Sequence, residues 1–219
     1  MGSNVKNVIE KALKENRFPT EAECREVLKE YGIPVLEYGV AHSEKEALEI
    51  AKKFGYPVVL KMLNVKGLHK SKVNGVRLDI KSDEEVIKHF NELKSEWGVL
   101  ISPMVRGFEL FVGAFQDEQF GVVVSFGTGG KYVEVYKDVS FRIVPFDRKE
   151  VIKMIDETKV SKILKGYRDK KPKNLDAIVD LLLKLSKLML ENPEIKEVDL
   201  NPTFIFDDRI AVADARFIL

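Results

Sequence analysis

The hydrophobic pattern of this 219-residue chain changes character close to residue 103. Before that point, short apolar segments such as 58–62 alternate with segments whose apolar residues recur at helical spacing. After it, β-branched and aromatic residues predominate from 109 to 144, and a Leu-, Ile- and Val-rich helix is expected at 175–191. This order of elements predicts an α+β fold of two lobes that meet near residues 101–106.

Capping residues mark where the first helices begin. Thr20 and Glu23 have the spacing of a capping box, and Ser43 and Ser82 each precede a helical stretch. Gly32 is a natural left-handed stop for the helix that Thr20 begins. We expect a helical extension over 1–17, a first lobe over 18–103 and a second lobe over 104–219. Strands are expected at 35–40, 58–62, 76–80, 99–101, 197–200, 203–206 and 210–213, among others.

Charge balance, cysteine count and hydropathy limit which partners and which cellular location the chain can have. Positive and negative charges nearly cancel, at a net +1, which argues against non-specific binding of nucleic acid. A single cysteine, Cys24, allows no internal disulfide, fits a reducing cytoplasm and is expected in a helix core. There is no apolar run of membrane-spanning length and no signal-peptide core. The chain is therefore predicted to be cytoplasmic, with neither nucleic acid nor membrane as a partner.

Two basic features could face phosphate. Lys61 ends an apolar strand and could aim its ammonium group into a cleft, although a strand-end lysine can also simply reach solvent. The loop 66–76 combines three lysines, His69 and Ser71 with two glycines. Glycines allow backbone N–H groups to form an anion-binding nest, to which lysines add charge. Because the loop leads into a strand, it is not a Walker-type loop, and a solvated basic hairpin is the alternative.

The segment 101–107 crosses between the predicted lobes. Its backbone could offer hydrogen bonds to the edge of an adenine, with Met104 and Val105 beside the ring, and Glu109 could accept from ribose hydroxyls. A turn followed by a surface glutamate is the alternative interpretation.

Acidic and amide side chains gather near the C-terminus. Alternation along a strand places Asp199 and Asn201 on one face, and a turn at Asp207 and Asp208 could bring Asp214 opposite them. Oxygen ligands of this kind suit Mg²⁺, which takes one or two carboxylates together with phosphate oxygens and water. A polar strand face in solvent is the alternative.

A glycine-rich run at 127–130 allows two interpretations. It could form tight turns that need positive φ, or it could lie close to phosphate. Asp138 and Arg142 follow and could line the cleft or form ion pairs.

Six motifs in order resemble one family, the ATP-grasp domain of ADP-forming acetyl-CoA synthetases in the form of a separate β subunit. They are Glu30-Tyr31-Gly32-Ile33-Pro34, Gly55-Tyr56-Pro57-Val58-Val59-Leu60-Lys61, His69-Lys70-Ser71, Asn74-Gly75-Val76, Phe126-Gly127-Thr128-Gly129-Gly130 with Glu134, Asp138 and Phe141-Arg142, and Asp199-Leu200-Asn201-Pro202. The resemblance spans roughly 18–219, and succinyl-CoA synthetase β subunits look like more distant relatives. The resemblance implies an ATP-grasp fold that holds ATP or ADP with Mg²⁺ between its lobes.

The resemblance also implies roles for individual residues. Nucleotide contacts would come from Lys61, Lys66, Ser71, Gly75, Val76, Met104, Val105 and Glu109. The Mg²⁺ ligands would be Asp199, Asn201 and Asp214. The catalytic residues would be His69 and Lys70, since the family has a loop histidine here that can carry phosphate between distant active sites.

The family reaction is acyl-CoA + ADP + Pi ⇌ acid + CoA + ATP, through an acyl phosphate and a phosphohistidine. This chain contains no obvious CoA-binding region, so the resemblance implies an α subunit that carries the CoA-binding and phosphohistidine domains. The chain alone is then expected to bind nucleotide without overall turnover. Two alternatives stay open: an ATP-grasp carboxylate–amine ligase, and a non-catalytic nucleotide-binding regulator.

Overall fold

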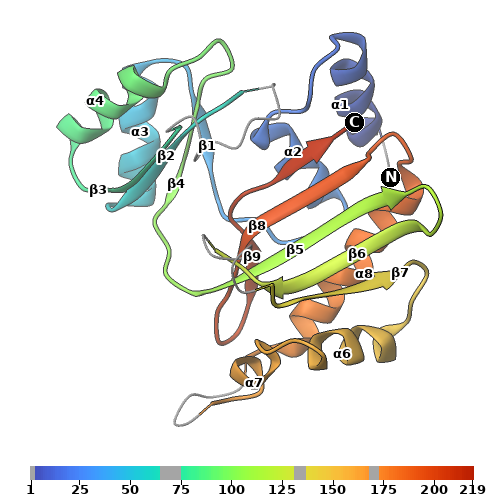
Figure 1. Cartoon of the computed structure of the whole chain (residues 1–219). Coiled ribbons are helices and arrows are strands. Elements are labelled where there is room, and N and C mark those ends of the chain that lie inside the picture. The colour runs from blue at the N-terminus through green and yellow to red at the C-terminus, as the bar shows by residue number, and fades with distance from the viewer. Residues whose placement is uncertain (1–2, 65–74, 131–136, 168–172) are drawn as a thin grey trace.

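The structure is a computed structural model that describes residues 3–64, 75–130, 137–167 and 173–219. Two antiparallel sheets lie beside each other and define a small and a large lobe (Figure 1). In these residues the small sheet has the strand order β1-β4-β2-β3. The large sheet has the order β10-β8-β5-β6-β7, with β9 paired to β8. The expected α+β class is confirmed.

The small lobe consists of a sheet with two helices packed on one face. Its elements are β1 (Gly39–Ala41), α3 (Glu44–Phe54), β2 (Val58–Met62), β3 (Val76–Ile80), α4 (Asp83–Leu93) and β4 (Val99–Pro103). Ser43 and Ser82 cap α3 and α4 as expected, each accepting a backbone N–H at 3.3 Å. Along β2, Val58 and Leu60 join the apolar core under the helices, while Lys61 points to the opposite face. That opposite face is turned toward the large lobe.

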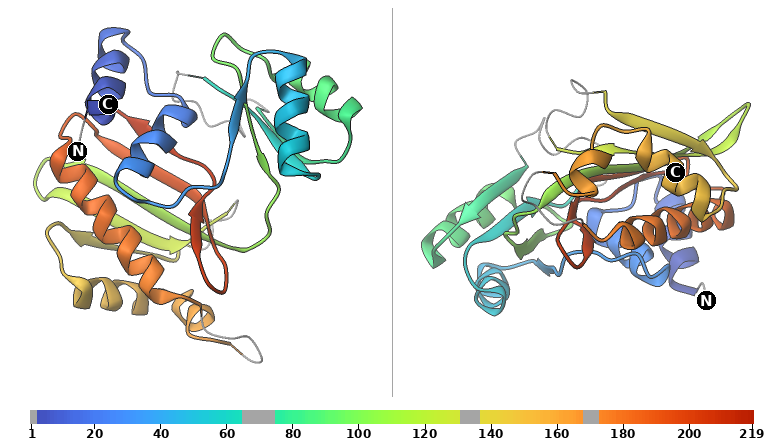
Figure 2. Two further views of the ribbon diagram at one scale, coloured as in Figure 1. Left: turned by 180° about the vertical axis from the view of Figure 1, so that it is seen from behind. Right: turned by 90° about the horizontal axis from the view of Figure 1, so that it is seen from below.

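The large lobe is a sheet with α8 lying across one face (Figure 2). Its elements are β5 (Phe108–Asp117), β6 (Gly121–Thr128), β7 (Val139–Ile143), α6 (Arg148–Asp156), α7 (Ser161–Leu164), α8 (Leu175–Glu191), β8 (Glu197–Ile205), β9 (Ile210–Val212) and β10 (Arg216–Ile218). Alternate residues of β5, such as Leu110 and Val112, enter the core with α8, and their neighbours Glu109 and Phe111 face the other way. None of the described helices combines the length and the apolar character needed to cross a membrane.

The two N-terminal helices belong to the large lobe, which differs from the expected division of the chain. The helices are α1 (Ser3–Lys14) and α2 (Glu21–Glu30). Val5 and Ile9 of α1 and Cys24 and Leu28 of α2 are buried in the same core cluster as the large sheet. Residues up to about 34 therefore pack with the second lobe, because their apolar stripes are covered by that sheet and not by the small one. The capping box of α2 is present, with Thr20 and Glu23 bonding reciprocally at 2.7 and 3.2 Å.

The strands of the structure differ from the prediction in three places. The expected strand at 35–40 is divided, since Val35 bridges to Val212 in the large sheet and only 39–41 pairs in the small one. The segments 197–200 and 203–206 form the single strand β8, because β5 pairs with both of them. The strand β10 was not predicted, and it adds to β8 at an edge of the large sheet.

Candidate functional site

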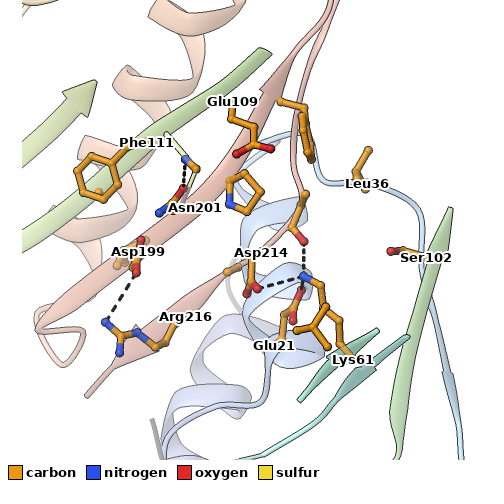
Figure 3. A pocket seen from close by; sticks show the side chains of 18 of the residues that line it. Glu21, Leu36, Lys61, Ser102, Glu109, Phe111, Asp199, Asn201, Asp214 and Arg216 are labelled. Atoms are coloured by element: carbon orange, nitrogen blue, oxygen red, sulfur yellow. Dashed lines mark hydrogen bonds and ion pairs between the residues drawn. The ribbon is translucent and has the colours of Figure 1, made fainter. Parts of the chain in front are cut away.

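A cavity of about 1270 Å³ lies between the two lobes (Figure 3). Lys61 and Ser102 contribute from the small sheet, and Phe111, Asp199 and Asn201 contribute from the large one. The large-sheet residues stand on the face that α8 does not cover, because side chains alternate along each strand. The cavity therefore has one wall from each lobe.

Lys61 reaches this cavity with its ammonium group already engaged. The residue is only 6% exposed. Its Nζ donates to the Glu21 carboxylate at 3.0 Å, to the carbonyl oxygen of Ala213 at 2.7 Å and to the Asp214 carboxylate at 3.1 Å. The predicted direction of Lys61 is thus observed. In this structure, however, its partners are protein groups contributed by the large lobe.

Glu21 and Arg25 are components of the site that the sequence reasoning missed. The Arg25 guanidinium is fully buried and donates twice to Glu21 Oε1, at 3.1 and 2.6 Å. It also donates to the carbonyl oxygens of Leu36 and Ala213. A signal for this pair is present in the sequence, because both residues share the buried stripe of α2 with Cys24. A charged pair at the i and i+4 positions of a buried stripe needs partners from elsewhere in the fold.

The crossing segment borders the cavity through Met104, Val105 and Glu109. The backbone N–H of Met104 donates to the carbonyl oxygen of Pro57 at 3.0 Å, so this donor is already used. Glu109 is bound through its backbone, where its carbonyl oxygen accepts from Gly129 N at 3.0 Å. Its side chain remains on the cavity wall (Figure 3).

The glycine-rich run is required by close packing more than by turn geometry. A Cβ on Gly127 would lie 2.0 Å from the carbonyl oxygen of Asp138, and one on Gly129 would lie 2.3 Å from the carbonyl carbon of Leu110. Only Gly130 of this run has a positive φ, at 89°. Its N–H donates to Asn201 Oδ1 at 3.0 Å, so the run ends at the cavity wall.

Asp138 and Arg142 do not act together in the cleft. The Asp138 carboxylate accepts from Thr128 Oγ1 and from the backbone N–H groups of Lys159 and Val160, which makes it a structural anchor. Arg142 forms ion pairs with glutamates outside the cavity, including Glu157 at 2.6 Å.

The three predicted metal ligands line the same cavity. Asp199 and Asn201 follow each other on one face of β8, and Asp214 lies just before β10. Asp199 Oδ1 is buried and has no hydrogen-bond partner, whereas its Oδ2 lies 3.7 Å from Arg216. The pKa of Asp199 is raised to about 6, mainly by burial; Arg216 opposes the rise, and the nearby carboxylates of Asp214 and Glu197 add to it.

These residues fit a bound Mg²⁺. An unpartnered buried carboxylate oxygen is costly, and a divalent cation would satisfy it. Within the described ranges, no three His, Cys, Asp or Glu side chains come together as a metal cage. Asn201 could supply an amide oxygen and Asp214 a second carboxylate.

The remaining predicted residues belong to the loop 66–76. Lys66, His69, Lys70 and Ser71 lie outside the described residues. Gly75 is buried, and its carbonyl oxygen accepts from Met62 N at 2.9 Å. Val76 opens β3 beside Lys61 and lines the cavity. The end of the loop therefore returns to the strand that supplies the lysine.

Comparison with known proteins agrees with this geometry. The model of the ATP-grasp domain family matches residues 11–219. The chain therefore belongs to the ATP-grasp family.

The relatives of known activity narrow the family. The chain is 43% identical to the β subunit of acetate–CoA ligase (ADP-forming) I from Pyrococcus furiosus, covering 99% of this chain and 98% of that one. It is 46% identical to acetate–CoA ligase (ADP-forming) I from Archaeoglobus fulgidus, over 97% of this chain but only 32% of the relative. Within the ATP-grasp family, the chain thus belongs with the ADP-forming acetate–CoA ligases, at the length of their β subunit.

A solved structure shows the same architecture. It is the dinucleotide-forming acetyl-coenzyme A synthetase 1 of Ca. Korarchaeum cryptofilum, in complex with coenzyme A and Mg-AMPPCP. In that structure a phosphohistidine segment points towards the nucleotide-binding site. The identity is 37% and the TM-score 0.86, covering 98% of this chain and 99% of that chain.

Proposed function

We propose that this chain is the nucleotide-binding β subunit of an ADP-forming acid–CoA ligase, and that its cavity holds Mg-bound ATP or ADP. The observation that supports this most directly is the composition of the cavity. Lys61 arrives from the small lobe, while Asp214 and the unpartnered Asp199 oxygen arrive from the large lobe. A polyphosphate needs both a positively charged side chain and a magnesium site, because the negative charge of its oxygens must be neutralised during phosphoryl transfer.

The nucleotide would lie across the crossing segment. Met104 and Val105 would border the adenine and Glu109 the ribose, since all three face the cavity. The Met104 N–H is occupied by Pro57. Adenine recognition would therefore rely on other backbone groups of this segment. Asp199, Asn201 and Asp214 would hold Mg²⁺ near the phosphates, with Lys61, Lys66, Ser71, Gly75 and Val76 as the phosphate contacts.

The rest of the reaction would need an α subunit. The Archaeoglobus ligase is about three times the length that this chain covers. We infer that the partner carries the CoA-binding and phosphohistidine domains, and that His69 and Lys70 pass the phosphoryl group on this side. A neutral imidazole nitrogen is a competent nucleophile near neutral pH. The lone thiol of Cys24, buried in α2, fits the cytoplasm as the place of action.

Calorimetric titration tests the nucleotide site. ATP and ADP, each with Mg²⁺ or with a chelator, are titrated into the purified chain. We expect magnesium-dependent binding and no acyl-CoA formation by the chain alone. With an α subunit, His69→Ala should abolish overall turnover and keep nucleotide affinity largely unchanged.

Other outcomes would contradict the proposal. ATP-dependent ligation by the chain alone would favour a carboxylate–amine ligase. Nucleotide binding without phosphoryl transfer, even with an α subunit, would favour a regulator. A folded chain that binds neither nucleotide would remove the proposed site altogether.

A further inference from the structure

We propose that Glu21 and Arg25 of α2 are positioning residues of the nucleotide site, which hold Lys61 so that its contact with Asp214 exchanges for a phosphate oxygen. This inference rests on the proposed function, because it concerns how the same cavity receives a nucleotide. It adds two residues and a defined exchange to that site.

Lys61 can form only a limited number of hydrogen bonds. An ammonium group has three N–H donors and no acceptor. The three oxygens around Nζ, from Glu21, Ala213 and Asp214, lie at 2.7 to 3.1 Å and use all three donors. A phosphate oxygen can therefore be bound by Lys61 only if one of these contacts is given up.

Two of the three contacts are fixed by one guanidinium group. Arg25 donates twice to the Glu21 carboxylate and once to the carbonyl oxygen of Ala213. The side chains of Glu21 and Arg25 are 1% and 0% exposed. Pulling Lys61 away from Glu21 would leave a buried charge with fewer partners, which is strongly unfavourable. Arg25 suits this role because its planar fork holds several acceptors in fixed directions.

The third contact is the replaceable one. The Asp214 side chain is 27% exposed and lines the cavity, so its carboxylate can be rehydrated or bound elsewhere at lower cost. An incoming phosphate oxygen replaces one anionic acceptor by another and leaves Lys61 fully bonded. Asp214 is then released from Lys61 on the side of the cavity where Asp199 stands, and both carboxylates could approach Mg²⁺ (Figure 3).

The exchange links phosphate binding to metal binding. Without Mg²⁺, a nucleotide whose phosphate binds Lys61 has the Asp214 carboxylate close to that phosphate. The carboxylate and the phosphate then repel each other. With Mg²⁺, the same carboxylate gains a ligand role. Lys61 belongs to the small lobe and its holders to the large one, so the arrangement also fixes one lobe against the other at the site.

The positioning role is tested with the double variant Glu21→Gln/Arg25→Met. It removes one negative and one positive charge, so the net charge around the phosphates stays the same. We expect Mg-ADP to bind about tenfold more weakly by calorimetry, since a charged hydrogen bond that orients Lys61 is lost. Glu26→Gln on the same helix is the matched control, because Glu26 bonds Lys29 and Tyr38 away from the cavity and should leave affinity unchanged.

Equal affinity in a folded double variant would overturn the positioning role. If the double variant fails to fold, Arg25→Lys serves in its place, since it keeps the charge and loses the fork. The expected result is again several-fold weaker binding, and unchanged binding again refutes the role.

The exchange itself is tested in metal-free buffer with Asp214→Asn and Asp199→Asn. Each variant removes one carboxylate from the cavity, but only Asp214 contacts Lys61. Metal-free ADP should bind several-fold more tightly to Asp214→Asn than to Asp199→Asn, while the affinity gained from Mg²⁺ falls in both. Equal metal-free affinities would refute the exchange. No binding of Mg-ADP by the wild-type chain would refute the proposed function instead.

Discussion

Asp199→Asn should stabilise the metal-free protein at neutral pH while it removes the benefit of Mg²⁺. The Asp199 side chain is largely buried, and one of its carboxylate oxygens has no hydrogen-bond partner. Its pKa is raised from 3.8 to about 6. A carboxyl group whose pKa is raised on folding opposes folding once it is ionised. The penalty is absent below the unfolded pKa and is fully present above the folded one.

The size of the effect follows from the two pKa values. A rise from 3.8 to about 6 corresponds to roughly 3 kcal/mol of unfolding free energy at neutral pH. The side chain keeps 24% exposure, so this is an upper value. Asparagine introduces a buried amide that needs its own partners, which costs roughly 1 kcal/mol at every pH. The change between about pH 4.5 and pH 8 is therefore the better quantity, and we expect about 2 kcal/mol.

Urea denaturation in the presence of a chelator measures this change. The unfolding free energies of wild type and Asp199→Asn are compared at about pH 4.5 and about pH 8. The variant should gain on the wild type as pH rises, and added Mg²⁺ should then stabilise only the wild type. Parallel pH profiles would refute the argument, since they would mean that the Asp199 carboxylate is solvated or already paired.

Two further predictions concern stability alone. Burial tends to raise the pKa of Glu23, but hydrogen bonds led by Arg17 outweigh it and hold that pKa below its usual 4.5; the stabilisation is therefore present above that value and lost as pH falls through the folded pKa. Glu23→Gln should flatten the acid limb of the pH–stability profile, and an unchanged limb would contradict this. Gly129→Ala should destabilise the protein by roughly 3 kcal/mol or more in thermal melts, because a Cβ there would lie 2.3 Å from the Leu110 backbone. Gly121→Ala, with φ of 74° and open space around the Cβ, should cost only about 1 kcal/mol; equal losses at both sites would contradict the packing argument.

Much of the candidate site could be predicted because its residues lie in local patterns. Lys61 at a strand end, and Asp199 with Asn201 on one strand face, are set by period-two alternation, and both patterns reach the same cavity. The roles of Lys66, His69, Lys70 and Ser71 stay predictions, since they lie outside the described residues. The link between Lys61 and Asp214 was not predicted, because the two residues are 153 positions apart.

The sequence by itself determined the elements whose causes are local. Side-chain caps at Thr20, Ser43 and Ser82 begin three helices, and the change in hydrophobic period near residue 103 separates the two sheets. Tertiary structure alone decided which sheet covers α1 and α2, and how residues 35–40 divide between two sheets. It also decided that Glu21 and Arg25 hold Lys61. An apolar stripe or a buried charge indicates that a packing or ionic partner is needed. Which residue becomes that partner depends on which distant surfaces the folded chain brings together.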